Sequence, residues 1–305
     1  MKYLPRIADM VLKERLAAFG AVLIEGPKWT GKTTTAMQQA QSILQLQDPD
    51  RRDDNLATAA TMPSLLLKGK QPRLIDEWQD APTLWDAVRI AVDKSGGLPG
   101  QYILTGSNTV DKDKIYHSGT GRITRMKMYP MSLWESGDSS GEISLKELFD
   151  NPDYDIDGIT SQLEIPELIR VACRGGWPAT LQMTEAAGMV IASDYVNSVC
   201  EVDILSIDKR QRNPKIARQI IRSYARNIST IAKRTSIFAD ITSSGDLTLS
   251  IDTFDDYIRM LEKLYVIQDI DAWCPAIRSK TAIRSMPKRG FSDPSIAVAA
   301  MGVNA

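Results

Sequence analysis

The sequence has little of two residue types on which many functional sites depend. It holds three cysteines, Cys173, Cys200 and Cys274, and one histidine, His117. The cysteines are far apart and odd in number, so they indicate neither a disulfide framework nor a metal site, and they fit a reducing cytoplasm. One histidine cannot make a metal site, and no Ser-His-Asp or Cys-His constellation can be assembled without a second.

Long apolar runs and a strong net charge are also missing. No uncharged stretch approaches the about 18 residues that a membrane-spanning helix needs. The first twenty residues carry charges throughout and lack the apolar core of a signal peptide. The net charge is −1, so the field of the whole molecule indicates no partner. These absences predict a soluble cytoplasmic protein that does not enter a membrane.

What the sequence does contain is a regular alternation of short apolar runs and helical patterns over its first ~140 residues. The runs are 21–25, 74–76 and 101–105, and the helical patterns are 33–43 and 84–92. This alternation predicts an α/β fold in which helices flank a parallel sheet. Residues 122–128 alternate polar and apolar side chains and are a candidate for one more strand.

The turn after the first apolar run carries a complete phosphate-binding motif. Gly26 to Thr33 reads GPKWTGKT, which fits G-x-x-x-x-G-K-[ST] between a strand and a helix. Its glycines let backbone N–H groups turn inward onto phosphate oxygens. We expect Lys32 to reach the β- and γ-phosphates of a nucleotide and the Thr33 hydroxyl to bind Mg²⁺. The predicted nucleotide-binding residues of this motif are Gly26, Pro27, Lys28, Trp29, Thr30, Gly31, Lys32, Thr33 and Thr34.

The other two apolar runs also end in polar side chains. One ends at Asp76 and Glu77. We expect Asp76 to hold Mg²⁺, as in a Walker B strand, and Glu77 to orient and activate the attacking water. The other run leads to Ser107 and Asn108. In P-loop ATPases with an extra strand between the two Walker strands, a polar side chain there senses the γ-phosphate, and either residue could do so.

Arg122 is a candidate for completing the site, because the glycines before it indicate a loop. An arginine aimed at the γ-phosphate stabilises charge in the transition state, in cis or from a neighbouring subunit. The alternative is a surface arginine on a strand.

The second half of the chain has a mostly helical pattern that begins after a turn-rich linker at residues 136–141. Its end runs in the order helix, turn, helix and strand-like segment, with the turn at 243–246 and the segment at 265–270. That order is typical of a winged helix-turn-helix. We therefore expect a P-loop domain at 1–140, a helical domain at 141–230 and a winged-helix domain at 231–290.

One helical segment of this half carries a basic face. Arg218, Arg222 and Arg226 recur every four residues, which places them on one side of a helix. Near them stand Lys209, Arg210, Arg212 and Lys215. A second basic run includes Arg278, Lys280, Arg284, Lys288 and Arg289. Contact with a DNA backbone is one interpretation; a solvated face or a surface that docks protein is the other.

Together these segments resemble a known family, the prokaryotic ATPases in which an AAA-type domain is joined to a C-terminal domain of unknown function. The resemblance also rests on MYPMSLWE at 128–135, GGWP at 175–178 and KRGFSDP at 288–294. It implies an AAA-like ATPase core followed by a helical and winged-helix region. Longer members continue into a nuclease-like domain, so residues 291–305 are expected to be the start of a truncated one, and no nuclease chemistry is predicted.

The predicted function is therefore Mg²⁺-dependent binding and hydrolysis of ATP, coupled to an unknown conformational output. ATP is preferred over GTP because the sequence has no Asn-Lys-x-Asp guanine motif. The alternative is a nucleotide-gated binding or DNA-binding switch with little turnover. A kinase acting on a small substrate is a weaker third hypothesis. The partners left open are DNA, a second copy of the chain and an unknown protein.

Overall fold

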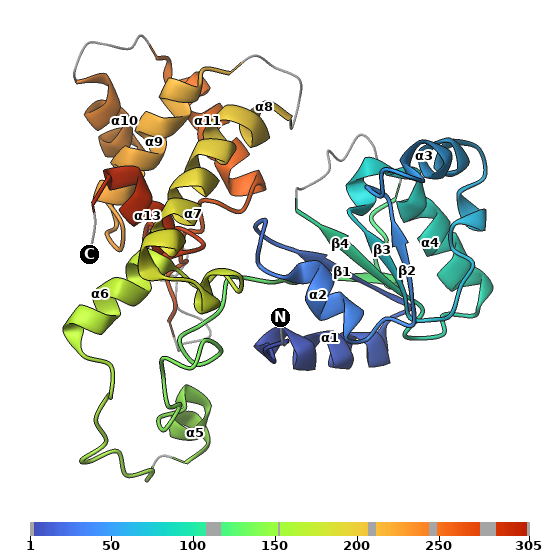
Figure 1. Ribbon diagram of the computed structural model, residues 1–305, viewed down its shortest axis with the longest axis horizontal. Helices are drawn as coiled ribbons and strands as arrows, with labels where there is room; N and C mark the ends of the chain where they lie inside the picture. Colours follow the sequence, from blue (N-terminus) through green and yellow to red (C-terminus); the bar gives the residue numbers. More distant parts are fainter. Residues whose placement is uncertain are drawn as a thin grey trace. The chain divides into compact units, whose positions relative to one another are not determined.

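Five short strands form one parallel sheet in the N-terminal half of the chain. In the computed structural model, which describes residues 3–107, 117–151, 153–206, 212–243, 249–274 and 285–303, they are β1 to β5, of which Figure 1 labels the first four. Their bounds are β1 (Ala21–Glu25), β2 (Ser42–Gln45), β3 (Arg73–Asp76), β4 (Tyr102–Gly106) and β5 (Ile123–Lys127). The strand order is β2-β3-β4-β1-β5, and all neighbours are parallel. The predicted α/β fold with a parallel sheet is confirmed.

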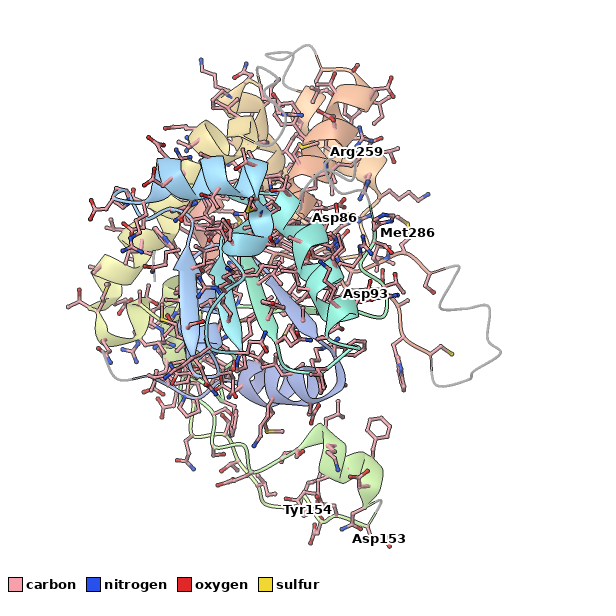
Figure 2. The ribbon with its side chains drawn as sticks, turned by 90° about the vertical axis from the view of Figure 1, so that its right-hand side faces the viewer. Asp86, Asp93, Asp153, Tyr154, Arg259 and Met286 are labelled. Atoms are coloured by element: carbon pink, nitrogen blue, oxygen red, sulfur yellow. The ribbon has the colours of Figure 1, made fainter. Side chains whose placement is uncertain are left out.

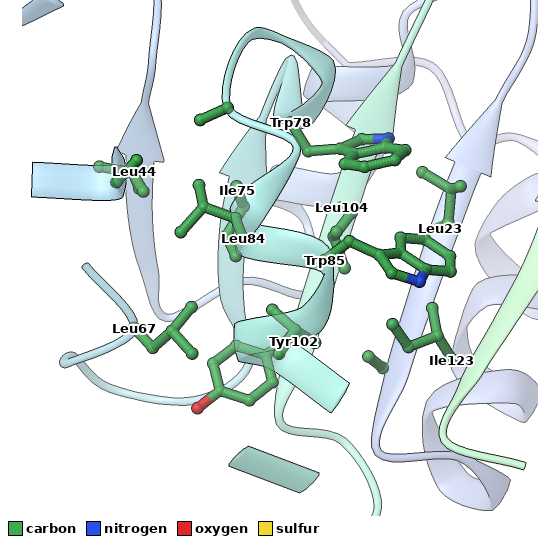
Figure 3. Packing of buried hydrophobic residues seen from close by; sticks show 14 of the residues in the cluster. Leu23, Leu44, Leu67, Ile75, Trp78, Leu84, Trp85, Tyr102, Leu104 and Ile123 are labelled. Atoms are coloured by element: carbon green, nitrogen blue, oxygen red, sulfur yellow. The ribbon is translucent and has the colours of Figure 1, made fainter. Parts of the chain in front are cut away.

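Helices cover both faces of this sheet, because its strands bury side chains on both sides. The helices are α1 (Ile7–Ala18), α2 (Lys32–Met37), α3 (Arg52–Thr61) and α4 (Thr83–Lys94), with 3-10 turns η1 (Pro63–Leu65) and η2 (Trp78–Asp80). Since successive strand residues point to opposite faces, Leu23 packs in a cluster with α4, whereas Val22 and Ile24 pack in one with α1 and α2. Trp78 and Trp85 fill the first cluster, with ring centroids 5.0 Å apart (Figure 3).

The helix predicted at 33–43 was too long. Helix α2 ends at Met37, and Ser42–Gln45 pairs in parallel with β3 as the edge strand β2. The backbone N–H of Gln41 donates to Pro72, which guides the chain into this pairing. Only Leu44 of this strand is buried, and the strand is four residues long. The sequence therefore lacks the longer apolar run by which a buried strand is recognised.

The chain divides into two compact units, Met1–Tyr129 with Ile258–Ile267, and Pro130–Tyr257 with Gln268–Ala305. The second half is helical, as predicted. Its helices are α5 (Leu145–Asp150), α6 (Ile165–Arg174), α7 (Glu185–Ser198), α8 (Ile204–Ser206), α9 (Pro214–Arg226), α10 (Arg234–Thr242), α11 (Ile251–Lys263) and α13 (Pro294–Met301), with a 3-10 turn η4 (Thr180–Gln182) and a π-helical turn η5 (Val199–Asp203). None of the helices among the described ranges is both long and apolar enough to cross a membrane.

The predicted winged helix-turn-helix has its two helices, α10 and α11, but is not confirmed as a whole. Ser244, Gly245 and Asp246 of the predicted turn lie outside the described residues. The strand-like run 265–270 forms isolated bridges at Ile267 and at Ile270, the latter antiparallel to Lys288, but no strand within the described residues.

Two segments of the family resemblance meet inside the second unit, 117 residues apart in sequence. The backbone N–H of Gly176 donates to the Asp293 carboxylate over 2.8 Å. The Trp177 indole donates to the Ser295 hydroxyl over 3.0 Å and packs on Tyr195 with ring centroids 4.7 Å apart. These contacts fix α13, which packs against α6, α7 and α9. We refer to this cluster of Gly176, Trp177, Asp293 and Ser295 as the α13 joint.

Candidate nucleotide-binding site

The turn between β1 and α2 is held in a narrow loop by its own backbone and by the segment after β5. A Cβ on Gly26 would lie 2.0 Å from the Met128 carbonyl oxygen, so only glycine fits there. The buried Thr30 hydroxyl donates to the Pro27 carbonyl over 3.0 Å. Gly31, with φ of 87°, turns the chain into α2. Lys28 and Thr34 are exposed, and so is 53% of Trp29, so Trp29 does not lie in the core.

Lys32 points back into this loop. Its ammonium donates to the carbonyls of Gly26 over 3.0 Å and Pro27 over 2.6 Å, and only 6% of the residue is exposed. Burial lowers the pKa of the Lys32 side chain to about 8, although the nearby carboxylates of Glu77 and Asp76 oppose the shift. The loop therefore holds a buried cation beside inward-turned backbone, which suits an anionic ligand.

The Asp76 carboxylate accepts hydrogen bonds from hydroxyls on two different elements. The Thr33 hydroxyl at the start of α2 and the Thr105 hydroxyl on β4 each donate to its Oδ1 over 2.6 Å. Carboxylate and hydroxyl oxygens are hard donors of the kind that Mg²⁺ prefers. The residues present therefore fit a Mg²⁺ ion bound through Thr33 and Asp76.

Glu77 is held in a defined orientation at the end of β3. Its backbone has φ of 53°, and its N–H donates to the Thr105 hydroxyl over 3.3 Å. The carboxylate oxygen Oε2 accepts from the Ser107 hydroxyl over 3.1 Å and from the Gln79 amide. Ser107 thus touches the residue expected to activate water. Asn108, the other sensor candidate, lies outside the described residues.

The sheet order explains why these side chains gather. Strand β4 lies between β1 and β3, so the carboxyl ends of all three meet at one edge of the sheet. Ligands of open α/β sheets bind beyond this edge. The structure brings together Lys32, Thr33, Asp76, Glu77 and Ser107.

Comparisons with known proteins agree with this geometry. Residues 18–136 match a family described as "AAA domain", and residues 165–305 match one described as "Domain of unknown function (DUF8612)". The chain joins an AAA domain to a domain of unknown function. This confirms the family resemblance. No curated protein matches the chain.

One solved structure shares this fold over nearly the whole chain. The Walker-type ATPase of Pyrococcus abyssi matches with a TM-score of 0.55 and 14% identity, over 98% of this chain and 96% of that one. A DNA replication initiation factor matches with a TM-score of 0.29 and 17% identity, over 84% and 87% of the two chains, which is too distant for an argument. At these identities the likeness shows the fold alone.

Arg122 does not reach the phosphate loop of its own AAA domain. It precedes β5, and its carbonyl accepts from Ala21 N–H at the start of β1, so it lies at the amino edge of the sheet. Its guanidinium pairs with Asp93 on α4 over 2.7 Å (Figure 2 labels Asp93). This placement argues against the first of the two alternatives for Arg122, action in cis, because parallel strands place their two ends at opposite edges; action from a neighbouring subunit stays a prediction.

Three residues of the AAA domain that the sequence reasoning did not assign also support the site. Thr105 contacts Asp76, Gln79 contacts Glu77, and Arg6 donates to the loop carbonyl of Thr30. The sequence held a signal for Thr105, because this residue is the polar one in an otherwise apolar buried strand. Gln79 and Arg6 had none, since each acts through tertiary contacts.

The basic face on α9 is exposed but partly neutralised. Arg218 pairs with Glu201 over 2.9 Å and Arg226 with Asp240 over 3.0 Å; Arg222 is exposed and has no ion pair within the described ranges. Arg289 of the second basic run is buried on Asp269. Lys209, Arg210, Arg278, Lys280 and Arg284 lie outside the described residues.

Helix α11 weakens the DNA interpretation further, because the second helix of a DNA-binding helix-turn-helix enters the major groove. Its sequence, IDTFDDYIRMLEK, carries four acids against one arginine and one lysine. Such a helix would repel phosphates, so the structure brings no continuous cationic face to this region within the described residues.

Proposed function

We propose that the AAA domain binds ATP with Mg²⁺ and hydrolyses it to ADP and phosphate. The observation that carries this proposal is the meeting of the buried Lys32 ammonium, the Thr33–Asp76 pair and the oriented Glu77 at one sheet edge. These are the parts that phosphoryl transfer to water requires, because catalysis there is mainly positioning and charge stabilisation.

In this proposal each group has one role. Lys32 exchanges the carbonyls of Gly26 and Pro27 for β- and γ-phosphate oxygens. Thr33 and Asp76 would hold Mg²⁺, which when bound would neutralise charge on the phosphates. Glu77 orients a water molecule for in-line attack and accepts its proton, while Ser107 and Gln79 keep the carboxylate in place.

The alternative is a nucleotide-gated switch with little turnover, and the presence of Glu77 favours hydrolysis over it. A DNA contact is not part of the proposal, given the paired arginines of α9 and the acids of α11. The cytoplasm, the proposed location, agrees with the free thiols of Cys173 and Cys200.

The test is phosphate release from ATP by the wild type, Lys32→Ala and Glu77→Gln, each with Mg²⁺ and with EDTA, and with and without duplex DNA. We expect Glu77→Gln to retain ATP binding and to lose turnover by about 10²-fold or more. Lys32→Ala should lose binding as well, and EDTA should abolish turnover.

Asp80→Asn is the matched control, because Asp80 lies three residues after Glu77 and its side chain accepts from Gln47, while its bond to Glu77 is made by the backbone N–H and is kept in the variant. It removes the same charge and should leave turnover within about twofold, as surface changes usually do. Turnover by Glu77→Gln equal to that of Asp80→Asn would contradict hydrolysis through Glu77. Lys32-dependent ATP binding without turnover in the wild type would establish the switch instead, and stimulation by duplex DNA would restore DNA as a partner.

A further inference from the structure

The first described residues of the chain place a buried cation behind the phosphate loop. Arg6 precedes α1, and only 6% of it is exposed. Burying a guanidinium is unfavourable unless its N–H groups find acceptors. The acceptors of Arg6 therefore indicate which segments of the chain this residue holds in place.

Two of these acceptors are carbonyls from distant parts of the AAA domain. One guanidinium nitrogen, Nη1, donates to the Thr30 carbonyl over 2.7 Å, and Nη2 donates to the Tyr129 carbonyl over 2.8 Å. Thr30 lies in the phosphate loop, and its own hydroxyl closes that loop on Pro27. Tyr129 follows β5 and is the last residue before the chain enters the second unit at Pro130.

The same exit segment also supports the other end of the loop. The Met128 N–H donates to the Glu25 carbonyl over 2.7 Å, and the Met128 carbonyl occupies the space in which a side chain on Gly26 would lie. The loop therefore contacts the exit segment directly at Gly26 and through Arg6 at Thr30. A change of loop shape at either point must be accommodated by residues 128–129.

Arg6 is itself held in place by its neighbours. Its backbone N–H donates to Asp9 over 2.7 Å, and Asp9 accepts from the Tyr3 hydroxyl over 2.5 Å. Tyr3 also lies 3.0 Å from the Thr35 hydroxyl on α2, the helix after the loop. Burial and the bond to Asp9 raise the pKa of Tyr3 to about 12, so it remains a neutral donor at physiological pH.

We propose that Arg6 is a positioning residue that holds the phosphate loop in its nucleotide-binding shape and couples nucleotide occupancy to the exit segment 128–129. The proposal rests on the proposed function, since it assumes that the loop binds ATP. It gives the conformational output a first step within the AAA domain. ATP contacts the loop, and Arg6 connects that loop by hydrogen bonds to the exit segment 128–129.

The test measures ATP binding by calorimetry in the wild type, Arg6→Ala, Arg6→Lys and Arg15→Ala. Arg6→Ala leaves two carbonyls without their donor, and we expect at least about tenfold weaker binding. Arg6→Lys should be intermediate, because an ammonium cannot reproduce a fork that bridges two carbonyls. Arg15→Ala is the matched control: Arg15 also anchors α1, through Thr124 over 2.7 Å, but does not touch the loop. It should bind ATP within about twofold of the wild type.

A second readout separates coupling from a merely structural role. Hydrogen exchange of a peptide covering residues 126–132 should change on addition of ATP in the wild type and Arg15→Ala, and should lose this response in Arg6→Lys. Equal ATP affinity in Arg6→Lys, Arg6→Ala and Arg15→Ala, or a wild-type peptide that does not respond to bound ATP, would overturn the proposal. Lys32→Ala in the same assay distinguishes the two failures: if the wild type shows no Lys32-dependent ATP binding, the proposed function itself has failed.

Discussion

The AAA domain and the second unit use their polar motif residues in different ways. In the AAA domain, Lys32, Asp76 and Glu77 come from two strand ends and converge where a ligand of an α/β sheet binds. In the second unit, Asp293 is buried and accepts from Gly176 N–H, Ser295 N–H and the Ser295 hydroxyl. Its three contacts are all internal, and Trp177 donates to the same serine.

The comparison teaches that a sequence motif can mark an internal packing contact, such as the α13 joint, as well as a ligand-binding site. Both units have glycines next to close backbone contacts, at Gly26 and at Gly176, where a Cβ would lie 2.2 Å from the Met131 carbonyl. At Gly26 the close contact brings Met128 against the phosphate loop, beside the candidate ligand site, whereas at Gly176 it brings Met131 against a segment whose polar groups contact each other. Removing a ligand-facing group should therefore reduce function and preserve stability, and removing a joint group should do the reverse.

The largest effect that we expect from this contrast is on folding, in Asp293→Ala. Loss of the carboxylate leaves the buried donors of Gly176 and Ser295 without their acceptor, at a cost of about 3 kcal/mol, or roughly a hundredfold in the folding equilibrium. Denaturant unfolding followed by circular dichroism measures it, and ATP affinity under native conditions should remain within about twofold of the wild type.

Asp271→Ala is the control for this prediction, because Asp271 is an exposed acid in the same unit. Its stability should differ from the wild type by no more than about 0.5 kcal/mol. If Asp293→Ala unfolds like Asp271→Ala but binds ATP poorly, the α13 joint belongs with the ligand-facing residues and the contrast between the units is broken.

The sequence allowed the phosphate loop to be predicted because its chemistry is local. Glycine spacing, one lysine and one threonine specify a turn that contacts phosphate through its own backbone. The α/β alternation was equally local. The α13 joint was not predictable, since Gly176 and Asp293 lie 117 positions apart and nothing between them signals their pairing. The position of Arg122 was not predictable for a related reason. Its neighbours in sequence indicate a loop, but only strand direction decides which edge of the sheet it occupies.

A smaller effect concerns the ligand-facing cation itself, through pH. The buried Lys32 ammonium has a pKa of about 8 without ligand, and phosphate oxygens favour its charged form. ATP affinity should therefore be highest at pH 7, where Lys32 is protonated. It should fall as the lysine deprotonates above pH 8, by about tenfold at pH 9 relative to pH 7. Calorimetry over pH 7 to 9.5 would be the measurement.

Lys32→Arg supplies the control for the pH prediction, because a guanidinium stays charged over this whole range. Its affinity is expected to be lower in absolute terms, since the larger head must fit the same narrow loop, but independent of pH. A wild-type affinity that stays flat up to pH 9.5 would mean that Lys32 does not supply the titrating cation.

The smallest effect is expected at Arg122, and it sharpens the comparison within the AAA domain. Arg122 and Asp93 form an ion pair whose side chains are 47% and 38% exposed, so the pair contributes little to stability. Because Arg122 lies at the amino edge of the sheet, Arg122→Ala should leave turnover per molecule within about twofold of the wild type. If a neighbouring copy instead received Arg122 at its phosphate site, the mutant would lose turnover, and the wild-type rate would rise faster than linearly with protein concentration. Phosphate release measured across a concentration series distinguishes the two: a linear wild-type series with an active mutant assigns catalysis to the carboxyl edge of one chain alone.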